Sequence, residues 1–129
     1  MNFEKNSTTE MYFFDTYALV ELSKHNPAYQ PYQQVQFTLS KLNIFEFYHT
    51  LLREAGEDTA ERATNLVYPF LADYDQSVIK AAAQLKFTHK KTKLSMTDCI
   101  GYILSKKLGI KFLTGDKEFE HFENVEFVK

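Results

Sequence analysis

The chain contains little cysteine, glycine and proline, and it lacks tryptophan. Its 129 residues include one cysteine, four glycines, three prolines and no tryptophan. The single cysteine, Cys99, excludes an internal disulfide, so we expect a reducing, cytoplasmic setting and a small buried hydrophobe at this position. The glycines are scattered singly, which excludes a glycine-rich phosphate-binding loop. No apolar run approaches the roughly 18 residues of a membrane span, so we expect no membrane insertion.

An excess of charge of one sign is also lacking. Fifteen basic and seventeen acidic residues give a formal net charge of −2, so any contact with nucleic acid must use a local basic patch. Hydrophobic residues make up 44% of the chain, with twelve Phe and eight Tyr, which indicates a globular protein with an aromatic core. Residues 1–10 are polar and aperiodic, as in a flexible leader. We therefore expect one domain over residues 11–129.

The apolar pattern alternates between strands and helices, which is typical of an α/β fold. The predicted or candidate strands are Met11–Phe14, Val35–Leu39, Phe70–Tyr74, Ile110–Thr114 and Val125–Val128. The predicted helices are about Thr16–Lys24, Ser40–Ala55, Glu57–Tyr68, Asp75–Phe87 and Ser95–Leu108, followed by a helical turn at Lys117–His121. In the helix Asp75–Phe87, the residues expected to face inward are Val78, Ile79, Ala82 and Leu85.

Four acidic residues carry most of the functional information: Asp15, Glu46, Asp98 and Asp116. Two of them, Asp15 and Asp116, directly follow predicted strands. Ligands of open α/β sheets bind just beyond the carboxyl ends of parallel strands. Carboxylates collected there suit hard divalent cations such as Mg²⁺ and Mn²⁺. This arrangement indicates phosphodiester chemistry.

Each acid also has an ordinary structural explanation. Asp15 and Asp116 are good N-cap residues for the segments that follow them. Asp98 stands three residues after Ser95, which is the acid position of a capping box. Glu46 lies mid-helix and fits a solvated helix face. Capping alone does not explain why the acids gather at one edge of the predicted sheet. Clustered carboxylates repel one another unless a cation neutralises them, so together they predict a metal site.

Four stretches of the sequence resemble a PIN domain, in particular the single-domain VapC-like toxins of toxin–antitoxin pairs. They are the apolar strand before Asp15-Thr16, the helix containing Asn43-Ile44-Phe45-Glu46, the helix start Ser95-Met96-Thr97-Asp98, and Thr114-Gly115-Asp116-Lys117-Glu118-Phe119. The resemblance covers essentially residues 11–129. Two features depart from it: Gly101 and Tyr102 stand where small aliphatic residues are usual, and the polar leader has no counterpart.

The resemblance implies a three-layer α/β/α sandwich with a mainly parallel central sheet, and a Mg²⁺- or Mn²⁺-dependent ribonuclease. It implies that Asp15, Glu46, Asp98 and Asp116 line the metal site and that the Thr114 hydroxyl supports the acids or a metal-bound water. It also implies a homodimer and a small antitoxin partner. The apolar helix Ser40–Ala55 and the helix after it are the natural surfaces for both contacts.

Other functions fit the sequence less well or differ in a testable way. A phosphatase of the haloacid dehalogenase type needs a second acid two residues after the first, where Tyr17 stands. A receiver domain needs an acidic pair at the first strand, which Phe14-Asp15 does not offer. A PIN-type RNA-processing nuclease that is not a toxin stays open. So does a catalytically idle PIN-like binding module, although the four acids argue against it.

A basic run precedes the Asp98 helix. It contains Lys86, His89, Lys90, Lys91 and Lys93. Such a run either holds an RNA backbone beside the metal site or is a solvated loop, and the sequence favours neither.

Overall fold

The computed structural model describes residues 10–129, so the predicted leader lies outside the described residues except for Glu10. Four strands form one parallel sheet in the order β2-β1-β3-β4. The strands are β1 (Met11–Phe14), β2 (Gln36–Thr38), β3 (Lys111–Thr114) and β4 (Val125–Phe127). They match four of the five strands expected from the apolar runs, with ends shifted by one residue or so.

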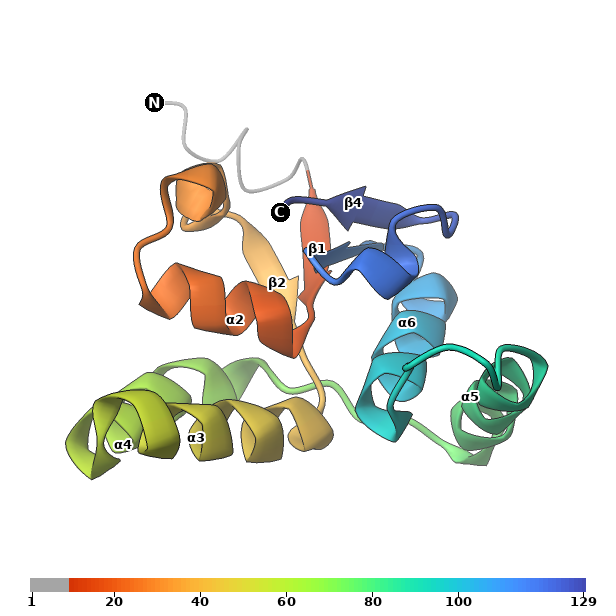
Figure 1. Ribbon diagram of the computed structural model, residues 1–129, viewed down its shortest axis with the longest axis horizontal. Helices are drawn as coiled ribbons and strands as arrows, with labels where there is room; N and C mark the ends of the chain where they lie inside the picture. Colours follow the sequence, from red (N-terminus) through yellow and green to blue (C-terminus); the bar gives the residue numbers. More distant parts are fainter. Residues whose placement is uncertain (1–9) are drawn as a thin grey trace.

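Helices connect the strands and cover both faces of the sheet (Figure 1). The α-helices are α2 (Thr16–Ser23), α3 (Lys41–Ala55), α4 (Glu57–Val67), α5 (Gln76–Thr88) and α6 (Met96–Leu108). The short 3₁₀ helices are η1 (Pro27–Tyr32), η2 (Tyr68–Phe70) and η3 (Lys117–Phe119). Among the described residues, no helix combines the length and the apolar character needed to cross a bilayer.

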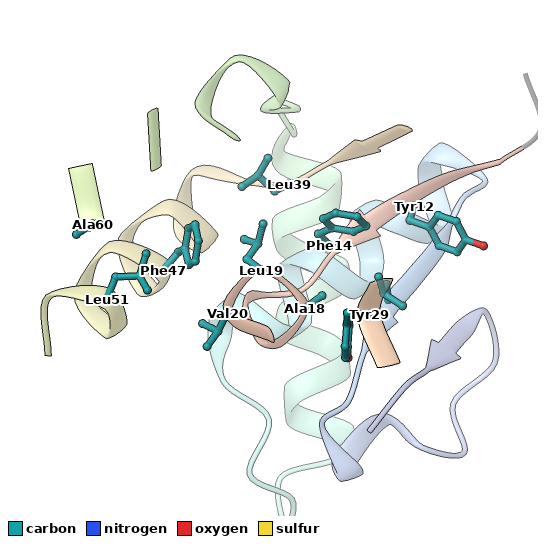
Figure 2. Close-up of a cluster of buried hydrophobic side chains, with 11 residues drawn as sticks. Tyr12, Phe14, Ala18, Leu19, Val20, Tyr29, Leu39, Phe47, Leu51 and Ala60 are labelled. Atoms are coloured by element: carbon teal, nitrogen blue, oxygen red, sulfur yellow. The ribbon is translucent and has the colours of Figure 1, made fainter. Parts of the chain in front are cut away.

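Strand β1 shows how the sequence builds three layers. Alternate side chains of a strand point to opposite faces. Tyr12 and Phe14 enter one core, formed with α2, α3 and η1, whereas Phe13 enters a second core with α5 and α6. Figure 2 shows the first core, where Phe14 lies among side chains from α2 and α3. The expected α/β/α sandwich with a parallel central sheet is therefore confirmed.

Two expectations about the middle of the chain are wrong. The candidate strand Phe70–Tyr74 is replaced by the 3₁₀ helix η2 and a single bridge between Leu71 and Leu39. Pro69 sits in the first turn of η2, where its missing N–H leaves no helical hydrogen bond unmade. Ile79 faces solvent with 50% exposure, although its neighbour Val78 is buried as expected. Adjacent residues lie about 100° apart on a helix, so a helix with one buried stripe cannot bury both equally.

The unusual pair in α6 has a packing explanation. A Cβ added at Gly101 would lie 2.8 Å from the Phe13 ring and 3.1 Å from the Phe112 ring, so the missing side chain lets α6 lie close against the sheet. Tyr102 is 3% exposed, and its hydroxyl donates to the carbonyl of Glu123 at 2.7 Å. Tyr102 thus packs in the second core.

Candidate active site

The structure brings the four predicted acids to one hollow at the carboxyl ends of β1 and β3. The hollow has a volume of ≈ 280 Å³. Its lining residues are Asp15, Thr16, Tyr17, Val20, Glu21, Glu46, Thr50, Asp98 and Asp116. The acids come from four separate elements: the ends of two strands and the helices α3 and α6. Both helices begin on the side of the sheet toward which the strands point (Figure 1).

Asp15 is the innermost acid and is only 3% exposed. One of its carboxylate oxygens accepts the backbone N–H of Thr16 at 2.9 Å, and the other accepts the hydroxyl of Thr114 at 2.6 Å. The Thr114 oxygen in turn accepts the backbone N–H of Asp116 at 3.0 Å. Thr114 therefore fixes one acid through its proton and the loop of a second acid through its lone pair.

A residue of the neighbouring helix α2, Thr16, helps to position the side chain of Glu46. Its carboxylate accepts the hydroxyl of Thr16 at 2.7 Å, and that hydroxyl accepts the side-chain amide of Asn43 at 3.0 Å. Because Asn43 supplies a donor, the single proton of Thr16 is directed toward Glu46. Asn43 is fully buried, and its carbonyl oxygen also accepts the backbone N–H and the hydroxyl of Ser40. A buried amide thus links the start of α3 to the acid one turn later.

Asp98 and Asp116 are both half-buried and both cap helical segments. Asp98 accepts the backbone N–H of Ser95 at 2.8 Å through Oδ2, and its own N–H donates to the Ser95 hydroxyl at 3.1 Å, which completes a capping box. Asp116 accepts the backbone N–H of Glu118 at 3.0 Å at the start of η3. Each of these acids keeps a carboxylate at the hollow while it caps.

The electrostatics of the hollow are those of crowded carboxylates. Burial, and then the nearby Asp98, raise the pKa of Asp15 to about 8. Burial also raises the pKa of Asp98 to about 6, and the charges of Asp116 and Glu46 act in the same direction. Burial and neighbouring charges therefore disfavour the negative forms of Asp15 and Asp98, which is the situation that a bound cation relieves.

The donor set fits a hard cation that keeps part of its water shell. In residues 10–129, no three His, Cys, Asp or Glu side chains are gathered tightly enough to hold one ion as they are placed. Mg²⁺ is commonly held by only one or two direct carboxylates, and water completes its coordination. An open hollow lined by four carboxylates suits this mode better than a closed cage, and the absence of a Cys or His among its lining residues disfavours softer metals.

Several residues that line the hollow are not among those predicted from the sequence to hold a metal. Tyr17, Val20 and Glu21 line the hollow from one face of α2, and Thr50 lies one turn after Glu46 on α3. The spacing of three and four residues along each helix is the one sequence pattern that indicates a shared helix face for these residues. Asn43 gave no such signal, because its contact to Thr16 joins residues 27 positions apart in the sequence.

Gly115 lies in close contact with the Tyr17 ring and with the backbone of Val128. A Cβ at this position would lie 2.3 Å from the Tyr17 ring and 2.4 Å from the carbonyl oxygen of Val128. A side chain there would push Tyr17 or the end of the chain away. The glycine therefore sets the close approach that brings Asp116 beside Tyr17 at the hollow.

Comparisons with known proteins agree with this architecture. The family model of the PIN domain matches residues 12–125. The structure of VapC20 from Mycobacterium tuberculosis, described as a sarcin-ricin loop cleaving toxin, is similar with a TM-score of 0.76 and 18% identity, covering 92% of this chain and 99% of that chain. No curated protein sequence matches the chain significantly.

Two toxin–antitoxin structures are also similar. VapBC2 from Rickettsia felis, bound to a DNA fragment from its promoter, gives a TM-score of 0.71 at 13% identity and covers 92% of this chain and 99% of that chain. VapBC-1 from nontypeable Haemophilus influenzae gives 0.68 at 17% identity, with 91% and 96% covered. At such identities the likeness concerns the fold.

Proposed function

This chain belongs to the PIN domain family, and from that premise we propose that it is a divalent-metal-dependent endoribonuclease, the toxin of a toxin–antitoxin pair. The observation that carries the proposal is the hollow lined by Asp15, Glu46, Asp98 and Asp116 at the carboxyl ends of the strands. Residues 11–129 would act as one nuclease domain. The similarity to VapC20, described as a sarcin-ricin loop cleaving toxin, supports the choice of RNA as substrate.

The proposed roles follow from the contacts of each residue. Asp15 and Asp98 would hold Mg²⁺ or Mn²⁺, with Glu46 and Asp116 completing the site directly or through water. Thr114 would keep Asp15 oriented, because its hydroxyl donates to one of the two carboxylate oxygens. A bound divalent ion lowers the pKa of a coordinated water and neutralises charge that builds on the phosphate. With four carboxylates at the hollow, this side of the protein would otherwise repel the substrate.

The antitoxin surface would lie on α3 and α4. Phe45 and Leu66 are 73% and 74% exposed, the highest values among the large apolar side chains of the described residues. Leu66 also borders an apolar hollow of ≈ 470 Å³, whose other walls include Leu19 and Phe37. Such a hollow suits the apolar face of a partner helix. Solved complexes of similar fold contain an antitoxin, which supports a partner here, and the same helices would serve a homodimer.

Cleavage of RNA by the purified protein tests the nuclease. We expect products from single-stranded RNA with Mg²⁺ or Mn²⁺, none with EDTA, and none from the Asp98→Asn variant with either metal. Folding of the variant is checked by circular dichroism. RNA binding without metal-dependent cleavage would instead identify a catalytically idle binding module.

Expression in cells separates a toxin from a processing nuclease. We expect growth arrest on induction, loss of the arrest for the Asp98→Asn variant, and rescue by a co-expressed small antitoxin. Abundant, folded parent protein that cleaves RNA in vitro but leaves growth unchanged would favour the processing nuclease.

A further inference from the structure

The positive charge of the chain is concentrated in one segment that its proposed chemistry does not use. Residues 76–97, which form α5 and the loop to α6, contain five lysines and no acid. The rest of the chain contains ten basic and seventeen acidic residues. A protein with a net charge of −2 thus carries a segment of charge +5, and this segment ends directly before Asp98.

The loop that bears most of these lysines is held in a defined shape. Lys86 donates to the carbonyl oxygen of Leu94 at 2.6 Å, which ties the end of α5 to the start of α6. The Thr92 hydroxyl donates to the carbonyl oxygen of His89 at 2.6 Å. Lys86 is therefore used within the fold, and the loop is braced on both sides of its tip.

Three other lysines of the segment point to solvent. Lys90, Lys91 and Lys93 are exposed, and none of them belongs to the ion pairs found in residues 10–129. A folded loop that presents three unneutralised ammonium groups within four positions makes a local positive field. Its natural complement is a polyanion.

Exposed apolar side chains flank the lysines. Phe87 is 66% exposed, and the ammonium of Lys90 lies 5.1 Å from the centre of its ring. Met96 is 61% exposed and opens α6. Met96 and Asp98 both lie in the first turn of α6. The patch therefore adjoins the helix start that carries one acid of the hollow.

We propose that this lysine–phenylalanine patch, made of Phe87, Lys90, Lys91, Lys93 and Met96, binds the single-stranded RNA that is cut at the hollow. The proposal rests on the nuclease function proposed above. The lysines contact phosphates on one side of the scissile bond, and a base stacks on the Phe87 ring. Exposed rings combined with lysines are the usual composition of a single-strand site, whereas a duplex offers no free base face to Phe87.

Binding measured without metal tests the lysines separately from cleavage. The probe is a fluorescein-labelled single-stranded RNA of about 15 nucleotides, long enough to span a typical single-strand site, titrated in EDTA and followed by anisotropy. The variant Lys91→Gln/Lys93→Gln is compared with the control Arg62→Gln/Lys111→Gln. The control removes two equally exposed charges, from α4 and from the start of β3.

We expect the patch variant to bind the RNA at least about tenfold more weakly at low salt, and the control to bind like the parent. The plot of log Kd against log salt should also flatten, by roughly 0.7 for each phosphate that the variant no longer neutralises. Equal weakening in both variants, or unchanged binding by the patch variant, would overturn the proposal. The latter result would leave the lysines free for another partner, such as an acidic protein.

The Phe87→Ala variant tests the stacking part. We expect roughly fivefold weaker binding of single-stranded RNA or more, with an unchanged salt slope, because the variant cannot stack a base but still neutralises the same phosphates. Tyr68→Ala, which removes another exposed ring, should bind like the parent. Equal binding of duplex and single-stranded RNA by the parent would overturn the assignment of a base to Phe87.

Cleavage assays keep this inference distinct from the nuclease proposal. If the parent cuts RNA with Mn²⁺ but the patch variant binds and cuts equally well, only the patch assignment fails. If the parent binds RNA through the patch but never cuts it, the nuclease proposal fails and the patch stands.

Discussion

The two helices that bring acids to the hollow begin in the same way but use their first turns differently. Both α3 and α6 start with a serine capping box, formed with Asn43 in α3 and with Asp98 in α6. In α6 the capping residue is itself an acid of the hollow. In α3 the capping amide is buried, and the acid of the hollow, Glu46, follows one turn later.

This difference shows that one residue can both cap a helix and line the hollow. Asp98 accepts the Ser95 N–H through Oδ2, and within the described residues its Oδ1 accepts no hydrogen bond from the protein. The helix start fixes the carboxylate and leaves one oxygen for the hollow. In α3 the acid is held by a relay of two hydrogen bonds: the Asn43 amide donates to the Thr16 hydroxyl, and that hydroxyl donates to the Glu46 carboxylate. We therefore expect one side chain, Asp98, to serve both the stability of α6 and the activity. At α3 we expect these two tasks to be shared by several side chains.

The largest expected effect is the loss of cleavage on Asp98→Asn. The amide oxygen still accepts the Ser95 N–H, so the helix start is kept, but the negative charge at the hollow is gone. We expect the cleavage rate in Mn²⁺ to fall by at least about a hundredfold, as when a key electrostatic group is removed from an active site. Single-turnover RNA cleavage measures it. Asp15→Asn should behave alike.

The control for this comparison is the melting temperature of the same variant in EDTA. A folded Asp98→Asn protein that cuts RNA at the parental rate would remove Asp98 from the site. An unfolded one would leave the Asp15→Asn variant to decide, since Asp15 caps α2 through an oxygen that an amide can also supply.

The relay of α3 should show a smaller loss on Thr16→Val. This change keeps the shape of the side chain but removes the proton that is directed to Glu46 and the acceptor for Asn43. We expect Mn²⁺ affinity and cleavage to fall by about 10- to 100-fold, as is typical when a group that orients a metal ligand is lost. Titration calorimetry with Mn²⁺ and single-turnover kinetics measure the two quantities.

Thr16→Ser is the matched control for the relay, because it restores the hydroxyl. It should recover most of the activity, and Glu46→Gln should set the upper limit of the loss. If Glu46→Gln binds Mn²⁺ like the parent, the site consists of three acids and the relay serves only the fold.

The burial of Asp15 and the nearby Asp98 predict a pH dependence of stability in the metal-free protein. The pKa of Asp15 is about 8 in the fold, against an ordinary value of 3.8, so the folded state holds a proton that the unfolded chain releases between these values. Stability in EDTA should therefore fall as the pH rises from about 5 to 8. Thermal melts should show Asp15→Asn to be more stable than the parent at pH 8 by about 5 °C or more, and equal or less stable near pH 5.

Added Mn²⁺ provides the control for the pH effect. It should raise the melting temperature of the parent at pH 8 and leave Asp15→Asn nearly unchanged. A parent protein whose melting temperature in EDTA is flat from pH 5 to 8 would show that burial and the neighbouring acids do not raise the pKa of Asp15.

Local signals in the sequence were sufficient for much of this molecule. The apolar runs before Asp15 and Asp116 gave the central strands β1 and β3, and strand ends of a parallel sheet meet at one edge. Capping patterns gave the starts of α3 and α6. The capping interpretation of Asp98 and its place at the hollow were treated as alternatives, yet the structure has both.

What the sequence could not give depends on contacts between distant segments. The hydrogen bond from Asn43 to Thr16 and the bond from Thr114 to Asp15 join residues 27 and 99 positions apart. The close approach at Gly101 likewise depends on rings from two strands. The apolar residues of the short segment after Pro69 have no clear period, so the sequence does not distinguish helix from strand there.

The smallest expected effect concerns the cap of α6 alone. Ser95→Ala removes the hydroxyl that accepts the Asp98 N–H but keeps the backbone N–H that holds the Asp98 carboxylate. We expect a loss of about 1 kcal/mol in unfolding free energy, measured by urea denaturation, because one helix N–H loses its partner. Cleavage should stay within a few-fold of the parent, since the carboxylate keeps its anchor. A loss of activity as large as that of Asp98→Asn would mean that the serine hydroxyl, and not the backbone, orients the acid, and the contrast between α3 and α6 would then disappear.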